Sequence, residues 1–183
     1  MWSFLASDCL FFGSLIATYL IYFGRSVEGP YPHDILDIPV TSVSTFVLLL
    51  SSFMFVLSLA AHTRGDYRGF RIWVFCTAIL GSTFLGFQTY EFQAFVHEGL
   101  TPRTNLFGST FFTLTGFHGA HVTIGVVWLL SLFFLSWRGK LGADKNLSVD
   151  IAGLYWHFVD IVWIIIFTVV YLTGVALGPG IGK

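Results

Sequence analysis

The chain has 183 residues, of which 55% are hydrophobic and only 10% are charged, and its net charge is −1 at pH 7. Soluble proteins carry about 25% charged residues, so this composition and the mean hydropathy of +0.79 indicate an integral membrane protein. A nucleic-acid-binding face needs an excess of basic residues. The near-neutral balance therefore argues against nucleic acid as a partner.

Five apolar stretches are long enough to cross a bilayer, because a spanning helix needs roughly 20 mostly apolar residues. In chain order they cover about 1–24, 39–62, 72–97, 106–137 and 150–175. The segments between them combine Gly or Pro with charged residues, which are signals for turns. Because the connections are short, the sequence predicts an all-α fold in which residues 1–183 form one transmembrane domain of five helices.

Lys and Arg are distributed unevenly over the two sides of this predicted bundle. The connections after the second and fourth spans hold six of them: Arg64, Arg68, Arg71, Arg138, Lys140 and Lys145. The opposite side holds Arg25, Arg103 and Lys183. Loops on the cytoplasmic side of a membrane carry more positive charge, so we expect a cytoplasmic N-terminus and an external C-terminus.

Ionisable residues inside the predicted spans are the candidate functional residues, because charge in a bilayer is costly and calls for an explanation. They are Asp8, Glu91, His118, His121, His157 and Asp160. Residues three apart share one face of a helix. That spacing relates the two histidines of the fourth span, and also the histidine and aspartate of the fifth.

Depth can be estimated from the rise of 1.5 Å per residue. On this count Glu91 and His118 belong to an outer layer, and the other four residues belong to an inner layer. An unpaired buried carboxylate must gain a donor or take up a proton. We therefore expect Asp8 within hydrogen-bonding reach of His121 or His157, and Glu91 near His118.

Several functions could use such a set of residues. Imidazole and carboxylate suit zinc or iron, two histidines on different spans could hold a haem, and acid–imidazole chains serve proton relays or transport paths. Alternatively, the groups pair across helices and fix the packing. The spacing is not HExxH, and His118 and His157 differ in depth, so pairing is favoured and no haem or metal is expected in this chain.

Small residues also recur four apart, a spacing that allows helices to approach closely in lipid. Packing inside the bundle is the ordinary interpretation of these pairs. The first two are also candidates for contact with a neighbouring subunit. The pairs are Gly13 with Ala17, Ser82 with Gly86, and Gly116 with Ala120.

Four segments together resemble the signature regions of a known family, in its order and spacing. They are FLASDCLFFGSLIATY (4–19), QTYEF (88–92), GSTFFTLTGFHGAHV (108–122) and YWHFVDIVWIIIFTVVYL (155–172). On these segments the chain is similar to subunit III of the haem-copper terminal oxidases. The chain resembles the family's five-span bacterial form.

The resemblance implies a non-catalytic core subunit of a proton-pumping oxygen reductase in aerobic respiration, in the inner (plasma) membrane of a bacterial cell. In the family, subunits I and II carry the haem and copper, whereas subunit III carries no redox centre. It packs directly against subunit I, holds structural phospholipid and supports proton uptake. The resemblance thus implies no catalytic, cofactor-binding or metal-binding residue in this chain.

Details of the motifs bear on the electron donor. The family usually has a glutamate where this chain has Asp8, and the Ser7-Asp8-Cys9 sequence resembles some quinol-oxidising members. The segments within 108–122 are more similar to the branch that oxidises cytochrome c, so cytochrome c is favoured over quinol. The alternative functions are an accessory subunit of nitric oxide reductase and a freestanding proton or solute channel.

Overall fold

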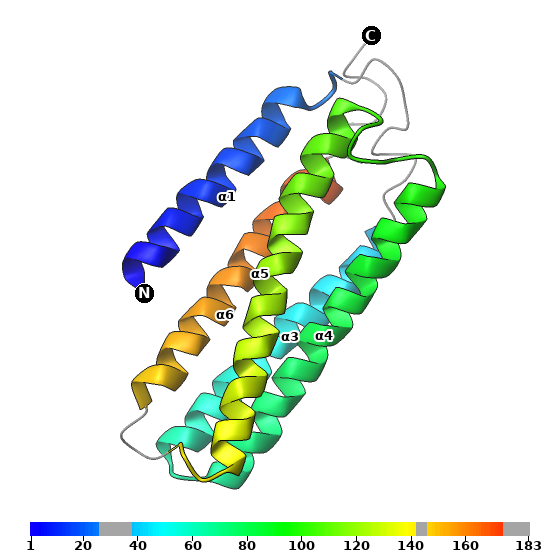
Figure 1. Cartoon of the computed structure of the whole chain (residues 1–183). Coiled ribbons are helices and arrows are strands. Elements are labelled where there is room, and N and C mark those ends of the chain that lie inside the picture. The colour runs from blue at the N-terminus through cyan, green and yellow to red at the C-terminus, as the bar shows by residue number, and fades with distance from the viewer. Residues whose placement is uncertain (26–37, 142–145, 174–183) are drawn as a thin grey trace.

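The computed structural model describes residues 1–25, 38–141 and 146–173. These residues form a bundle of long helices, with no strand in the described ranges (Figure 1). The helices are α1 (Trp2–Tyr22), α3 (Ile38–Thr63), α4 (Tyr67–His97), α5 (Leu106–Trp137) and α6 (Asn146–Ile166), which continues into the π-helical segment η2 (Phe167–Leu172). Five helical segments are long and apolar enough to cross a membrane. The predicted all-α, five-span fold is confirmed.

The predicted boundaries agree within two residues for α1, α3 and α5, whereas α4 and α6 begin earlier than expected. α4 begins at Tyr67 because the side chain of Asp66 caps it, accepting a hydrogen bond from Gly69 N at 3.0 Å. A Cβ at Gly69 would collide with the capping carboxylate, so glycine here permits the cap. Such a cap satisfies a free backbone N–H of the first turn, so the helix can begin before the apolar stretch does. Residues 174–175 of the predicted fifth span lie outside the described residues.

The helices lie roughly along one common direction in a single bundle (Figure 1). α3 and α4 form a closely packed antiparallel pair, and α5 packs beside α4. α6 lies against α3 and α5. α1 lies at the edge of the bundle, mainly in contact with α5 and to a smaller extent with α6 (Figure 1).

The indole of Trp156 on α6 holds the centre of the bundle together. A Cβ at Gly81 of α4 would lie 2.6 Å from its Cη2 atom, and a Cβ at Gly125 of α5 would lie 2.7 Å from its Cζ3 atom. The indole therefore occupies space that two glycines leave open. Its Nε1 also donates to Ser51 Oγ of α3 at 3.1 Å. One side chain thus contacts three neighbouring helices.

The small-residue pairs predicted from the sequence do not perform this packing. A Cβ at Gly13, Gly86 or Gly116 would meet no atom within 4 Å. Their interpretation as packing contacts inside the bundle is therefore wrong. Gly13, Ala17, Ser82 and Gly86 are exposed on the outer surface of the bundle, where a second subunit or lipid can reach them.

Candidate functional site

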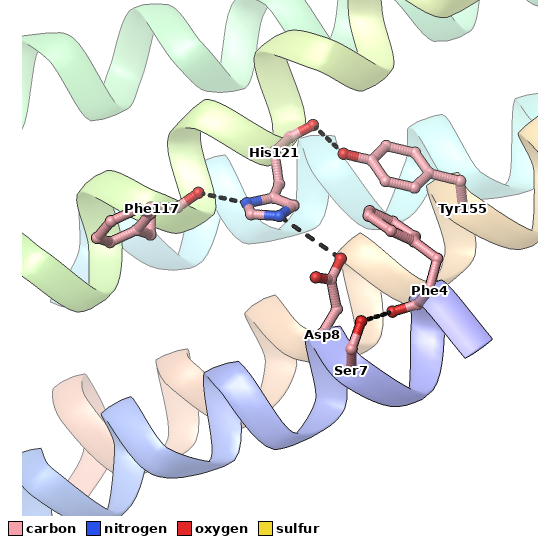
Figure 2. Close-up of polar contacts among 6 residues, drawn as sticks. All are labelled: Phe4, Ser7, Asp8, Phe117, His121 and Tyr155. Carbon is pink, nitrogen blue, oxygen red and sulfur yellow. Dashed lines mark hydrogen bonds and ion pairs between the residues drawn. The ribbon is translucent and has the colours of Figure 1, made fainter. Parts of the chain in front are cut away.

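Asp8, which is buried, and His121, which is partly buried, form a pair between α1 and α5. Asp8 Oδ2 lies 3.5 Å from His121 Nε2, and Asp8 is only 8% exposed (Figure 2). This position agrees with the pairing predicted from depth. The helical spacing of α1 turns Asp8 inward, together with the buried residues Leu5, Phe12 and Tyr19.

The other ring nitrogen of His121 determines what this pair can do chemically. His121 Nδ1 lies 2.8 Å from the carbonyl oxygen of Phe117, one turn earlier on α5. A carbonyl only accepts hydrogen bonds, so Nδ1 carries the hydrogen and Nε2 faces the carboxylate. Asp8 Oδ2 itself is buried and has no hydrogen-bond partner among the described residues, so at 3.5 Å the two groups are close without sharing a hydrogen bond.

Tyr155 brings α6 into the same contact. Its hydroxyl donates to the carbonyl oxygen of His121 at 2.9 Å, and its ring centroid lies 6.2 Å from that of Phe4 on α1 (Figure 2). The polar pair therefore lies where three helices meet. Tyr155 is a residue of this site that the sequence does not reveal, because nothing in its spacing distinguishes it from an interfacial tyrosine.

A second polar contact joins α3 to α6 through Ser52. Its hydroxyl donates to Asp160 Oδ2, and its oxygen lies 2.9 Å from His157 Nδ1. Since the single hydroxyl hydrogen goes to the carboxylate, His157 Nδ1 must donate to Ser52. Asp160 Oδ1 is buried without a hydrogen-bond partner among the described residues. The predicted face shared by His157 and Asp160 is confirmed, but a serine on another helix connects them.

Glu91 and His118 are not joined by a hydrogen bond, so this expected pairing is wrong. Glu91 instead accepts hydrogen bonds from Thr41 of α3 and, at 3.4 Å, from the hydroxyl of Tyr171 in η2. Hydroxyl donors satisfy a buried carboxylate as an imidazole would. Within the described residues, both ring nitrogens of His118 are buried without a hydrogen-bond partner.

Aromatic rings surround His118 instead of polar groups. Its ring is stacked on Trp163, with centroids 4.9 Å apart and planes 26° apart, and Phe84 approaches edge-on at 5.9 Å. Trp163 Nε1 donates to Thr45 Oγ1 at 2.9 Å. Trp163 also contacts Tyr171, with ring centroids 6.2 Å apart, and Tyr171 is the residue that donates to Glu91.

Other residues that connect the helices, and that sequence reasoning missed, carry hydroxyl or amide groups and lie within apolar helices. Gln88 Nε2 donates to the carbonyl oxygen of Thr115 at 2.7 Å and fixes α4 to α5. Gly119 leaves room for this amide, because a Cβ there would lie 2.6 Å from Gln88 Oε1. Within the described ranges, no three His, Cys, Asp or Glu side chains are grouped so that they could hold a metal ion.

A bundle of five membrane-length helices, with buried acids and two partly buried histidines in contacts between helices, defines a multi-pass membrane protein with a polar interior network. Residues 1–175 match the family model described as cytochrome c oxidase subunit III. The chain belongs to this family. The resemblance to oxidase subunit III is confirmed.

Curated relatives include subunits of oxidases with different electron donors. The chain is 39% identical over 173 residues to cytochrome c oxidase subunit 3 of Bacillus sp. strain PS3, an alignment that covers 94% of this chain and 84% of the relative. It is 39% identical to cytochrome bo(3) ubiquinol oxidase subunit 3 of Pseudomonas aeruginosa, covering 94% and 83%. It is 38% identical to quinol oxidase subunit 3 of Bacillus subtilis, covering 94% and 85%.

Proposed function

We propose that this chain is a core subunit of an oxygen-reducing haem-copper oxidase, in which subunits I and II carry the haem and copper and this chain carries no redox centre. The observation that carries the proposal is the match to the oxidase subunit III family over residues 1–175. The geometry supports it, because Asp8, Glu91 and Asp160 have partners that connect helices. Such contacts suit a subunit that supports the complex.

The proposed partners are subunit I in direct contact, subunit II in the same complex, and structural phospholipid. Support comes from small exposed residues, Gly13 and Ala17 on α1 and Ser82 and Gly86 on α4. The two glycines also have open space beside them. Small exposed residues allow a neighbouring helix to approach closely in a membrane. We propose that these two surfaces contact neighbouring helices.

We further propose that the N-terminus is cytoplasmic, in the plasma membrane of a bacterium, on the basis of the six-to-three distribution of Lys and Arg. Lys145 and Lys183 in that count lie outside the described residues. In this orientation Asp8 lies roughly 10 Å from the cytoplasmic end of α1. Reporter fusions after Lys140 and at the C-terminus test the orientation, because a reporter active only outside the cytoplasm should work at the second position alone.

The Asp8–His121 pair is the proposed link to proton uptake. Its carboxylate and imidazole lie 3.5 Å apart, and in the proposed orientation they are near the side from which the oxidase would take protons. The same pair also attaches α1 to the bundle. Its structural and proton-handling roles are separated by the Asp8 variants described in the Discussion.

Purification of the tagged chain from its own membranes tests the proposal as a whole. We expect subunits I and II to co-purify, with haem spectra and copper content of an oxygen reductase. Reduced cytochrome c is the expected donor, so the complex should consume oxygen faster with it than with ubiquinol. A co-purified enzyme that reduces nitric oxide but not oxygen, or a lone chain that conducts protons in vesicles, would contradict the proposal.

A further inference from the structure

A groove of about 380 Å³ lies between the beginning of α4 and the end of α5. Its apolar part is formed by Ile72 and Phe75 of α4 and by Phe133 and Trp137 of α5. The ring centroids of Phe75 and Phe133 are 5.1 Å apart, and those of Phe133 and Trp137 are 5.6 Å apart. The three rings therefore form a continuous surface. The groove contains none of the residues of the polar contacts described above.

Two arginines, Arg68 and Arg71, line the same groove at the end where α4 begins. They lie three residues apart in the first turns of α4 and therefore share one face of the helix. Arg71 Nε donates to the carbonyl oxygen of Tyr67 at 3.0 Å, which holds the guanidinium against its own helix. No described carboxylate lies within ion-pairing distance of either arginine.

The charge around the groove is predominantly positive. Arg64, Arg138 and Lys140 lie at the same end of the bundle, where α3 and α5 end and α4 begins. Asp66 is the nearest acid in the sequence, and its carboxylate accepts the hydrogen bond of Gly69 N. The N-terminus of α4 adds the positive end of a helix dipole. An anionic group is therefore favoured at this position.

The order of residues along α4 matches the order of chemical groups in a phospholipid. Arg68 and Arg71 come first, then Ile72, Phe75 and Cys76, so charge gives way to apolar surface over about 12 Å of helix. Trp137, at the end of α5, is 67% exposed, and tryptophan is enriched at the level of lipid headgroups. Basic pockets between membrane helices bind anionic lipid headgroups.

We propose that this groove binds one anionic phospholipid, whose phosphate lies between Arg68 and Arg71 and whose acyl chain lies along Ile72, Phe75 and Phe133. The site consists only of residues of this chain. This inference rests on the proposed function in two respects. The lipid would belong to the cytoplasmic leaflet because the N-terminus is proposed to be cytoplasmic, and the test uses the proposed oxidase complex.

Photochemical cross-linking in the purified complex tests the site directly. The complex is reconstituted in phosphatidylcholine vesicles that contain either phosphatidylglycerol or phosphatidylcholine with the same photoreactive acyl chain. We expect phosphatidylglycerol to label residues 72–76 and 133–137 in preference to phosphatidylcholine. Two arginines near a membrane surface correspond to a preference of roughly thirtyfold at low salt.

Arg68→Gln with Arg71→Gln should remove this preference, whereas the matched double variant Arg64→Gln with Arg138→Gln should retain it. The second variant loses two charges at the same end of the bundle but none from the groove. If the first variant fails to assemble, the parent complex still provides a test, because the preference should weaken as salt screens the arginines.

Equal labelling by the two lipids at low salt would overturn the proposal and would show ordinary contact with bulk lipid. Labelling confined to a co-purifying chain, with residues 72–76 unlabelled, would also overturn it, because a protein would then cover the groove. Failure of the proposed function gives a different result. The complex would lack haem, while phosphatidylglycerol would still label the groove of this chain.

Discussion

Asp8 on α1 and His121 on α5 form the only ion pair between helices within residues 1–25, 38–141 and 146–173, at 3.5 Å. The hydroxyl groups of Ser7, Ser14 and Thr18 on α1 all donate to carbonyl oxygens of α1 itself. α1 also lies at the edge of the bundle (Figure 1). The polar attachment of α1 to the other described helices therefore depends on Asp8.

Replacing Asp8 by leucine should weaken the attachment of α1 to the bundle, because leucine keeps an apolar side chain at the position and removes the carboxylate. Asp8→Leu leaves the partly buried His121 Nε2 without its partner. Because both side chains keep some exposure, 16% for His121 and 12% for Asp8, the loss should be smaller than the about 3–5 kcal/mol that breaking a fully buried pair costs. We expect a lower yield of assembled oxidase, measured as haem per copy of this chain, and a lower melting temperature. Ser7→Ala, a neighbouring change at an exposed hydroxyl, should leave both values unchanged.

Asp8→Asn separates the structural role from proton handling. The amide can donate one hydrogen bond to His121 Nε2 but cannot exchange a proton, so assembly should stay close to that of the parent. If the pair supplies protons, the fall of the oxygen-consumption rate at high pH should shift in this variant. An unchanged pH profile together with poor assembly of Asp8→Leu would leave the pair a structural role alone. Normal assembly of both variants would contradict that structural role.

His118 and His121 should respond in opposite ways to replacement by phenylalanine. His118 is surrounded by Trp163, Phe84 and Phe12, and neither of its nitrogens has a hydrogen-bond partner in the described chain. His118→Phe removes buried polar atoms whose desolvation opposes folding, so stability should be unchanged or higher. His121→Phe leaves Asp8 unpaired and should lower the melting temperature. Thermal unfolding of the two purified variants, measured side by side, gives the comparison.

The sequence identified the ionisable residues within the helices, but it predicted their partners only in part. Depth follows from counting residues along a helix, and it correctly placed Asp8 beside His121. Counting does not give the direction in which a side chain points. The prediction therefore paired Glu91 with His118, whereas in the fold His118 stacks on Trp163 and Glu91 accepts a hydrogen bond from Tyr171.

Hydroxyl partners were missed for a related reason. Ser52 crosses to Asp160 on another helix, whereas Ser58, six residues later, donates to the carbonyl oxygen of Phe55 in its own helix. Both are serines in the same apolar stretch, so the sequence contains no signal that separates them. The sequence also does not show which glycines are packed, because Gly81 lies against Trp156 while Gly86 faces open space.

The contrast between these two glycines gives a matched test of the packing at Trp156. Gly81→Ala places a Cβ 2.6 Å from Trp156, and crowding of a packed core destabilises by about 1–3 kcal/mol. Gly86→Ala meets nothing within this chain and should be neutral or stabilising by up to about 1 kcal/mol. Thermal unfolding of the purified chain in detergent measures both. Equal melting temperatures would show that the indole can move aside.

Gly86→Ala has a second use in the assembled complex. If the surface of Ser82 and Gly86 packs against a neighbouring helix, an added methyl group should reduce co-purification while the chain alone stays stable. Unchanged co-purification of both Gly86→Ala and the bulkier Gly86→Val would place this surface in lipid.

Ser52 should contribute more to stability than any serine that bonds only to its own helix. Ser52→Ala removes the donor to Asp160 and the acceptor for His157 at once, and an unsatisfied buried polar group costs about 1–3 kcal/mol. Ser58→Ala, which loses one bond within α3, should change stability by less than about 0.5 kcal/mol. The double variant Ser52→Ala with Asp160→Asn should then be more stable than the sum of the single effects predicts, by about 0.5–3 kcal/mol, because both changes disrupt one contact. Strictly additive effects would show that the hydroxyl and the carboxylate act independently, and the connection between α3 and α6 would then depend on Trp156 and Trp163 instead.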